Sequence, residues 1–233
     1  SSAASDVYKR QVNYNKALNQ RNTLLKQIAF NPKVKDTLDM WDTCLMEYGK
    51  CIIEERELFI KQLNDMVKGI HQHLTGEKES IEIGYEKNVT IEDYENMMRS
   101  KREMDLKYQS TQTGPHRDDM CFYINGIDVR KFGSQGQQRT AALSLKLAEI
   151  ELVKSIIHDT PILLLDDVMS ELDSSRKNYL LDSIKEIQTI VTCTGYDDFI
   201  KSRLHINQIY KVTNGMVDVF KICLLYTSDA ADD

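Results

Sequence analysis

A short apolar run that ends on two carboxylates, between Pro161 and Asp167, constrains the fold of this chain more than any other segment. Its four apolar residues, Ile162 to Leu165, lack the alternation with polar residues that a strand with one solvated face would show. The run therefore predicts a strand that is buried on both faces of a parallel sheet. In such sheets ligands bind beyond the carboxyl ends of the strands, which is where the two carboxylates lie.

The two carboxylates, Asp166 and Asp167, suit phosphate chemistry. Successive side chains of a strand face opposite sides, so one carboxylate can hold a magnesium ion while its neighbour orients a water molecule. Phosphoryl transfer depends mainly on such positioning and on charge neutralisation. The alternative is a strand that ends in a solvated acidic turn. The segment that follows, Ser170-Glu171-Leu172-Asp173, favours the nucleotide site.

A second polar segment, Gly133-Ser134-Gln135-Gly136-Gln137, precedes this strand. Glycine lets the backbone approach an anion closely, and Ser134 stands where the N-cap hydroxyl of a helix would stand. Phosphate would fit at the positive end of that helix, although a capped helix without a ligand explains the turn equally simply. The helix is indicated by apolar residues at helical spacing down to about His158, namely Ala141, Leu145, Ala148, Leu152 and Ile156.

The order of these pieces resembles the head of an ABC-type ATPase, in which a signature motif, a Walker B strand and a D-loop follow one another. Three features are similar to the RecF family in particular: the Gly-Pro-His-Arg-Asp-Asp segment from Gly114 to Asp119, the Ser-Gln-Gly-Gln signature, and Asp166-Asp167 in place of the usual Asp-Glu. The resemblance extends from about Asn13 to Val219. It implies an α/β fold, in which part of an ABC-type head (a P-loop NTPase-like sheet flanked by helices) carries an α-helical arm lobe.

The same resemblance implies ATP and Mg2+ as cofactors and gives the motif residues their roles. Asp166 would bind the magnesium ion, Asp167 would position the attacking water, and Asp173 would connect two active sites across a dimer interface. The signature residues would cover the ATP that is bound by a second subunit, so that the nucleotide joins two heads. These residues are Ser134, Gln135, Gly136 and Gln137.

The strand after Walker B usually ends in a histidine that senses the γ-phosphate in ABC heads. Here the corresponding place reads Thr192-Cys193-Thr194-Gly195, and Thr194 is the candidate for that role. A threonine hydroxyl can hydrogen-bond phosphate or water, but it cannot carry a proton near neutral pH as an imidazole does. The resemblance therefore implies slow hydrolysis, suited to a switch.

One motif of the family is missing from the sequence. No stretch matches Gly-x-x-x-x-Gly-Lys-[Ser/Thr], the loop whose amides and lysine hold the β- and γ-phosphates. In the RecF family this loop lies near the amino terminus, so the resemblance implies that the chain is a carboxyl-terminal part of a longer ATPase. Whether the chain is an enzyme is therefore open, and alone it is not expected to hydrolyse ATP.

Four segments are expected along the chain. Residues 1–11 and 222–233 look like translated sequencing-adapter read-through, with natural disordered termini as the alternative. Residues 12–107 are expected to form the helical arm lobe (lobe II of the family), and residues 108–221 the carboxyl-terminal part of the head with its signature, Walker B strand and D-loop.

Local patterns predict the elements of these segments. In the arm they indicate a helix, a second long helix that starts near Pro32 and ends at Gly76, a short strand at 81–85, and a third helix opened by Thr90 and Asp93. In the head they indicate a hairpin around Asn125-Gly126, a helix capped by Ser174 or Ser175, and a strand at 188–194. His116 and Arg117 could touch nucleotide or DNA, or form a hydrogen-bonded structural turn.

Composition limits the class of protein and its location in the cell. The 233 residues, 41% of them hydrophobic, can bury a core, and no run of 18 apolar residues indicates a membrane span. Five cysteines without metal-ligand spacing favour reduced thiols and a cytoplasmic location. A net charge of −6 excludes a protein that coats DNA by bulk electrostatics, so any DNA contact must be local.

The resemblance implies a function in recombinational DNA repair, gap repair and replication restart, with ATP-driven dimerisation on gapped DNA or on single-strand/double-strand junctions. The implied partners are DNA, a second copy of the protein, and RecR and RecO. Two alternatives are another SMC- or Rad50-like ATPase and a non-hydrolysing interaction domain. The arm, at roughly 70 Å for two antiparallel helices, is short for an SMC-type rod.

Overall fold

The computed structural model describes residues 2–193 and 207–220. The chain divides into two compact units, Ser1–Ile156 and Ile157–Asp233. Within the described residues no helix is long and apolar enough to cross a membrane. The thiols of the described cysteines, Cys44, Cys51, Cys121 and Cys193, are free.

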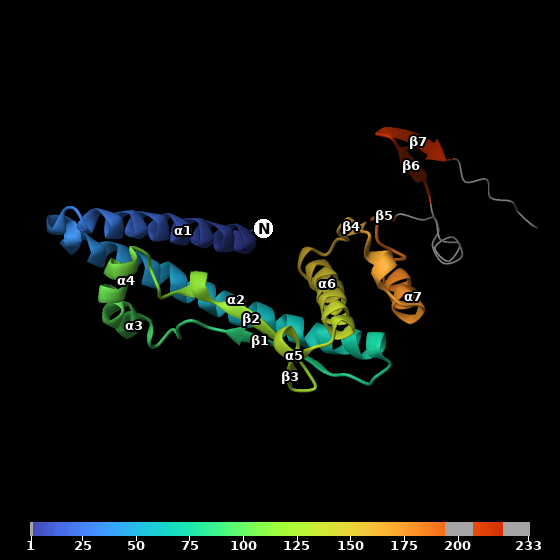
Figure 1. Cartoon of the computed structure of the whole chain (residues 1–233), viewed down its shortest axis with the longest axis horizontal. Coiled ribbons are helices and arrows are strands. Elements are labelled where there is room, and N and C mark those ends of the chain that lie inside the picture. The colour runs from blue at the N-terminus through green and yellow to red at the C-terminus, as the bar shows by residue number, and fades with distance from the viewer. Residues whose placement is uncertain (1, 194–206, 221–233) are drawn as a thin grey trace, which may run out of the picture. The chain divides into compact units, whose positions relative to one another are not determined.

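A helical hairpin forms the first part of unit 1. Helix α1 (Ser2–Ile28) is followed by the 3-10 helix η1 (Pro32–Thr37) and by α2 (Leu38–Thr75). Figure 1 shows α1 alongside the first half of α2, and both contribute to one core with the residues Tyr14, Ala17, Leu45 and Ile53. Gly76 ends α2 with a φ of 61°, a left-handed conformation that glycine adopts without steric cost. The helix before Pro32 and the long helix that ends at Gly76 are therefore confirmed, but the long helix starts at Leu38, because Pro32 opens the separate 3-10 helix η1.

The third predicted helix is broken into two. Thr90 Oγ1 accepts a hydrogen bond from the Asp93 N–H, as the capping prediction requires, and α3 (Tyr94–Ser100) follows. Lys101 then interrupts the helix before α4 (Arg102–Tyr108). Its φ of −90° and ψ of 3° lie outside the helical region, which no sequence signal at that position indicated.

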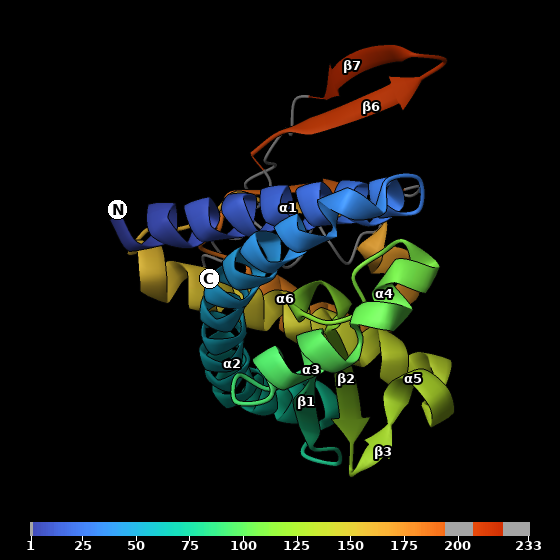
Figure 2. The same cartoon turned by 90° about the vertical axis from the view of Figure 1, so that its left-hand side faces the viewer.

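A three-stranded antiparallel sheet completes this side of unit 1. Strand β1 (Ile81–Glu86) pairs with β2 (Asp119–Ile124), and β2 pairs with β3 (Ile127–Asp128), as Figure 2 shows. Asn125 and Gly126 both have positive φ, 51° and 79°, which is the conformation of a type I′ turn. The predicted hairpin is confirmed.

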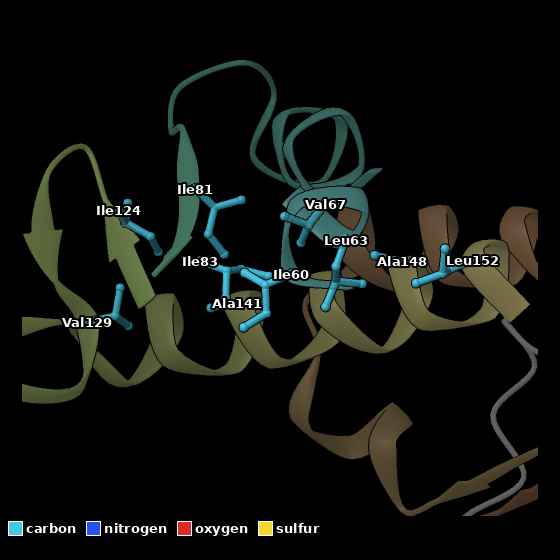
Figure 3. Close-up of a cluster of buried hydrophobic side chains, with 10 residues drawn as sticks. All are labelled: Ile60, Leu63, Val67, Ile81, Ile83, Ile124, Val129, Ala141, Ala148 and Leu152. Atoms are coloured by element: carbon cyan, nitrogen blue, oxygen red, sulfur yellow. The ribbon is translucent and has the colours of Figure 1, made fainter. Parts of the chain in front are cut away.

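The core around the signature helix combines residues that are distant in the sequence. The short helix α5 (Val129–Phe132) leads into α6 (Gln135–Ile157), which packs on the second half of α2 and on the sheet. Figure 3 shows the side chains converging from these elements, namely Ile60, Leu63, Val67, Ile81, Ile83, Ile124, Val129, Ala141, Ala148 and Leu152. Ile156 was predicted to continue the buried face of α6, but it is 60% exposed in the last turn, beyond this core.

This core extends across residue 107, the predicted boundary between arm and head. Ile60 and Ala141 belong to the same buried cluster, and the compact units divide only after Ile156. The two lobes were assigned by family resemblance and not by compactness, so their boundary stays a prediction. Helix α1 includes residues 2–11, and a helical conformation does not test the predicted artefactual origin of that segment.

Unit 2 contains a parallel strand pair. Strand β4 (Leu163–Asp166) is followed by η3 (Val168–Glu171), α7 (Ser174–Ser183) and β5 (Thr189–Thr192), and β4 and β5 pair in parallel. The hairpin of β6 (Ile209–Thr213) and β7 (Met216–Phe220) follows. The predicted parallel strand is confirmed.

Two details of the unit 2 predictions were wrong. The strand β4 was expected to be buried on both faces, but Leu164 is 70% exposed while Leu165 is buried, because among the described residues β4 pairs with β5 alone and only one face is covered. The N-cap of α7 is Asp173 instead of Ser174 or Ser175, since its carboxylate accepts a hydrogen bond from the Arg176 N–H. A carboxylate is as good an N-cap as a serine hydroxyl.

Candidate nucleotide site in two parts

The signature turn is closed by a reciprocal cap. Ser134 Oγ accepts a hydrogen bond from the Gln137 N–H at 3.2 Å, and Gln137 Oε1 accepts one from the Ser134 N–H at 3.0 Å. This is the capping-box arrangement, with serine at the N-cap and glutamine three residues later. The Ser134 hydroxyl accepts in this cap, so its proton can still be donated to an anion. Ser134 and Gln135 are exposed, and a Cβ at Gly136 would meet only Ser134 Oγ, at 3.9 Å.

The side chain of Gln137 is held at both ends of its amide. Its Oε1 accepts from Ser134, and its Nε2 donates to Glu79 Oε1 at 2.9 Å. In this structure Gln137 therefore shapes the turn through both its oxygen and its nitrogen. The nucleotide contacts predicted for Ser134, Gln135, Gly136 and Gln137 stay predictions.

The carboxylate pair lies in unit 2, at the ends of β4 and β5. Asp166 is the last residue of β4, in register with Thr192 at the end of β5, and the Thr192 hydroxyl donates to Asp166 Oδ1. Asp167 lies beyond the strand with a φ of 51°, so the alternation of strand side chains does not extend to it. Its N–H donates to both the carbonyl oxygen and the hydroxyl of Thr192, each at 3.2 Å.

Thr192 is the residue that the sequence reasoning missed. The prediction placed the threonine hydroxyl of this strand end at Thr194, which lies outside the described residues. The available signal was register: in a parallel pair, the residue opposite Asp166, the last residue of β4, is found by aligning the two apolar runs.

The last predicted site residue, Asp173, is engaged as the N-cap of α7. Its Oδ1 accepts from the Arg176 N–H at 3.0 Å, and its Oδ2 pairs with the Arg176 guanidinium at 2.8 Å. The backbone hydrogen bond from Arg176 lowers the pKa of the Asp173 carboxyl group below its ordinary value. Asp173 thus stays ionised at the exposed start of α7, and its predicted role across an interface stays a prediction.

The oxygen atoms at Asp166 suit a magnesium ion that is shared with nucleotide phosphates. Mg2+ is typically held by one or two carboxylates together with waters and substrate phosphates, not by a cage of protein ligands. The exposed Asp166 carboxylate, with the Thr192 hydroxyl beside it, provides oxygen donors of that kind. Among the described residues there is no cluster of three His, Cys, Asp or Glu side chains that could hold a metal unaided.

The Gly-Pro-His-Arg-Asp segment forms a hydrogen-bonded turn. His116 Nε2 lies 3.0 Å from the Thr111 carbonyl oxygen, which can only accept, so Nε2 carries a proton. In the neutral ring Nδ1 is then an acceptor, and the Tyr14 hydroxyl donates to it at 2.7 Å. Asp118 accepts from Arg56, Tyr85 and the Asn88 N–H. The structure therefore shows the hydrogen-bonded turn that was expected of His116, and a contact of His116 with nucleotide or DNA stays a prediction.

The protonation of His116 makes the stability of unit 1 depend on pH. Burial lowers the pKa of His116 below its ordinary value of about 6.5. The hydrogen bond to the Thr111 carbonyl oxygen opposes this shift, Arg117 adds to it, and Asp118 and Asp105 oppose it. Between the folded and unfolded pKa values the unfolded chain binds more protons. The free energy of unfolding should therefore rise with pH up to about 6.5.

Urea denaturation followed by circular dichroism between about pH 5 and 7 would measure this slope, and His116→Gln should reduce it. His158→Asn is the matched control, because His158 is exposed and asparagine tolerates its positive φ. An unchanged slope in His116→Gln would contradict the assignment.

The sequence of this chain was compared with those of known proteins. No family model matches the chain. The protein "DNA replication and repair protein RecF" of Lachnospira eligens is 58% identical over 208 residues, which is 88% of this chain and 57% of that protein. The protein of the same name from Lachnoclostridium phytofermentans is 56% identical over 207 residues, and that from Clostridium botulinum strain Langeland is 47% identical over 219 residues.

A solved structure shares the fold. It is described as the recombination mediator protein RecF-ATP in the RecFOR pathway, and it matches with a TM-score of 0.82 and 37% sequence identity. The match covers 93% of this chain and 59% of that one. The chain thus spans under three fifths of the length of the relatives it matches.

Proposed function

Because the chain belongs to the RecF family, we propose that it supplies the signature turn and the Walker B strand of an ATP-dependent DNA repair protein. The observation that carries this proposal is the coexistence of a capped, exposed Ser134–Gln137 turn and a carboxylate pair fixed at the ends of two parallel strands. Relatives named for DNA replication and repair support the process, and a relative solved with ATP supports the nucleotide.

In the proposed mechanism ATP lies between two copies of the protein. The Ser134 hydroxyl and the first N–H groups of α6 would contact the phosphates held by the other copy, where the positive end of the helix favours negative charge. Asp166 would hold a magnesium ion, which neutralises phosphate charge when bound. Asp167 would orient the attacking water, and hydrolysis would separate the copies.

The proposed setting follows from the same family. The protein would act in the cytoplasm on DNA with gaps or single-strand/double-strand junctions, and RecR and RecO would be its partners, as the pathway name of the ATP-bound relative supports. Hydrolysis needs a phosphate-binding loop that this sequence lacks. Tests of activity therefore use a hybrid protein, in which this chain replaces the matching segment of the Lachnospira eligens relative.

Replacing Ser134 by arginine tests the signature turn. In the hybrid protein, Ser134→Arg should abolish ATP-dependent dimerisation, because a long cationic side chain would fill the space over α6 that the partner's nucleotide needs. ATP binding by the monomer should be retained. Sedimentation velocity with and without ATP measures dimerisation, and equilibrium titration with a fluorescent ATP analogue measures ATP binding by the monomer.

Ser155→Arg is the matched control. Ser155 is exposed on the same helix, and 21 positions along α6 place it about 30 Å from Ser134. The control should dimerise like the unmodified hybrid. An unchanged dimer in Ser134→Arg would refute the proposed role of the turn.

A further inference from the structure

A chain of polar contacts runs from the signature turn into the buried core. The turn residue Gln137 donates to Glu79 Oε1, and the other oxygen of Glu79, Oε2, lies 3.4 Å from Nε2 of His71. Glu79 belongs to the segment between α2 and β1, whereas His71 lies in the last turns of α2. The end of the long helix and the start of the signature helix are thus joined through one glutamate.

His71 is fixed in turn by α6. Its side chain is 0% exposed, and its Nδ1 lies 2.9 Å from Ser144 Oγ. The Ser144 hydroxyl donates to the Thr140 carbonyl oxygen at 2.7 Å, so it must accept from His71, and Nδ1 therefore carries a proton. The contact of Nε2 with the Glu79 carboxylate is attractive only when Nε2 is protonated as well, so His71 anchors Glu79 as an imidazolium. Thr140 Oγ1 donates to the Gly136 carbonyl oxygen at 2.7 Å. These contacts form a closed ring that begins and ends in the signature turn.

We propose that Glu79, anchored by His71, is a positioning residue for the signature turn, because it orients the Gln137 amide that closes the turn on Ser134. A primary amide can rotate and can present either its oxygen or its nitrogen to Ser134. The Glu79 carboxylate accepts only, so it selects the orientation in which Nε2 points toward Glu79 and Oε1 toward the Ser134 N–H. This inference rests on the proposed function only for its consequence in ATP-dependent dimerisation.

The anchor makes the proposal specific. A glutamate on the surface without a second contact would rotate away when residue 137 changed, because side-chain rotation costs little in water. Glu79 has its second oxygen against a buried imidazole, so it should stay in place. A carboxylate introduced at position 137 would then be repelled, and the cap on Ser134 would open.

Two substitutions that interchange the carboxylate and the amide test this arrangement. Gln137→Glu places two carboxylates at hydrogen-bond distance, and the Ser134 amide of this chain should exchange its hydrogen about tenfold faster, the effect of one lost hydrogen bond. Adding Glu79→Gln should restore slow exchange, because the amide introduced at position 79 can donate to the carboxylate introduced at position 137, which can still accept from the Ser134 N–H. Exchange of the Ser134 amide hydrogen, measured by NMR on this chain, shows without nucleotide whether the cap is open or closed. Glu82→Gln, an exposed glutamate on β1, is the control and should change nothing.

In the hybrid protein the ATP concentration for half-maximal dimerisation should rise about tenfold in Gln137→Glu and return in the double variant. Restored exchange with the double variant supports the positioning role. If dimerisation then fails to respond in any variant, including Ser134→Arg, the proposed function is wrong while the positioning role stands. Slow exchange in Gln137→Glu, or fast exchange that the double variant does not reverse, overturns the positioning role.

Discussion

Asp167→Asn should lower the rate of ATP hydrolysis by the hybrid protein by about 10²- to 10⁴-fold, the range that a positioned acid or base contributes. The carboxylate would accept hydrogen bonds from the attacking water, whereas an amide would present a donor as well as an acceptor. The fold should be retained, because the Asp167 N–H is fixed by Thr192 and asparagine is one of the few residues that tolerate the positive φ found here.

The same variant should accumulate as the ATP-bound dimer, since assembly precedes the step that is blocked. Single-turnover hydrolysis measures the rate, and sedimentation velocity measures the dimer. Asp218→Asn on β7 is the control, because it removes one exposed carboxylate from another strand of the same unit. Hydrolysis at the unmodified rate in Asp167→Asn would remove Asp167 from the mechanism.

Arg21→Met should destabilise unit 1 by about 3–5 kcal/mol, the cost of removing one partner of a buried ion pair. The Arg21 side chain is 0% exposed and joins three segments. Its Nε donates to Asp42 at 2.5 Å, and one terminal nitrogen donates to Asp105 at 2.7 Å and to Thr111 at 2.9 Å. Methionine fills a similar volume but leaves the fully buried Asp105 without this cation.

The loss is read from the urea midpoint of this chain, with the slope of the transition as a check on the unfolded state. Arg99→Met is the matched control: the Arg99–Glu95 pair is exposed on α3, and its loss should cost no more than about 0.5 kcal/mol. Adding Asp105→Leu to Arg21→Met should recover part of the loss, because the uncompensated charge is then removed. Equal midpoints for Arg21→Met and Arg99→Met would show that the buried network does not hold the helices together.

The local elements of the fold could be predicted from the sequence because their signals are local. Pro32, Gly76 and the Asn125-Gly126 pair each act through their own backbone conformation, so the break between the first two helices, the end of α2 and the hairpin were found correctly. The N-cap of α6 at Ser134 is also local, and its hydrogen bonds are those the pattern indicates.

Features that depend on distant segments were not predictable in this way. The sequence pattern does not distinguish the buried Arg21 from the other charged residues of a polar helix. Its contacts with Asp42 and Asp105 form only when α1 packs against α2 and α4. Glu79 gives no signal, because its contact with Gln137 crosses from the end of α2 to α6. The contact of Thr192 with Asp166 was not predicted, because it follows from the pairing of β4 with β5 and not from the residues of either strand alone, and the role expected of Thr194 stays a prediction.

The positions of the motif residues could be predicted, and their contacts only in part. The resemblance placed Asp166 and Asp167 correctly at the end of a parallel strand. It did not indicate that Asp167 leaves the strand in a left-handed conformation, or that Gln137 uses its amide inside the turn. Both facts concern how a motif residue is held by its neighbours, which a motif pattern does not contain.

The central claim, that each active site combines residues of two copies, is tested most directly by mixing two inactive hybrid proteins. Ser134→Arg damages the signature turn and Asp167→Asn damages the water-positioning carboxylate, so a mixed dimer contains one site with both parts intact. An equal mixture should hydrolyse ATP faster than the sum of its components, at up to about a quarter of the unmodified rate. That upper limit applies to random pairing, in which half of the dimers are mixed with one working site each, and the Ser134→Arg defect at the other site of a mixed dimer lowers the observed rate. A mixture no more active than the sum of its separate components would contradict the account.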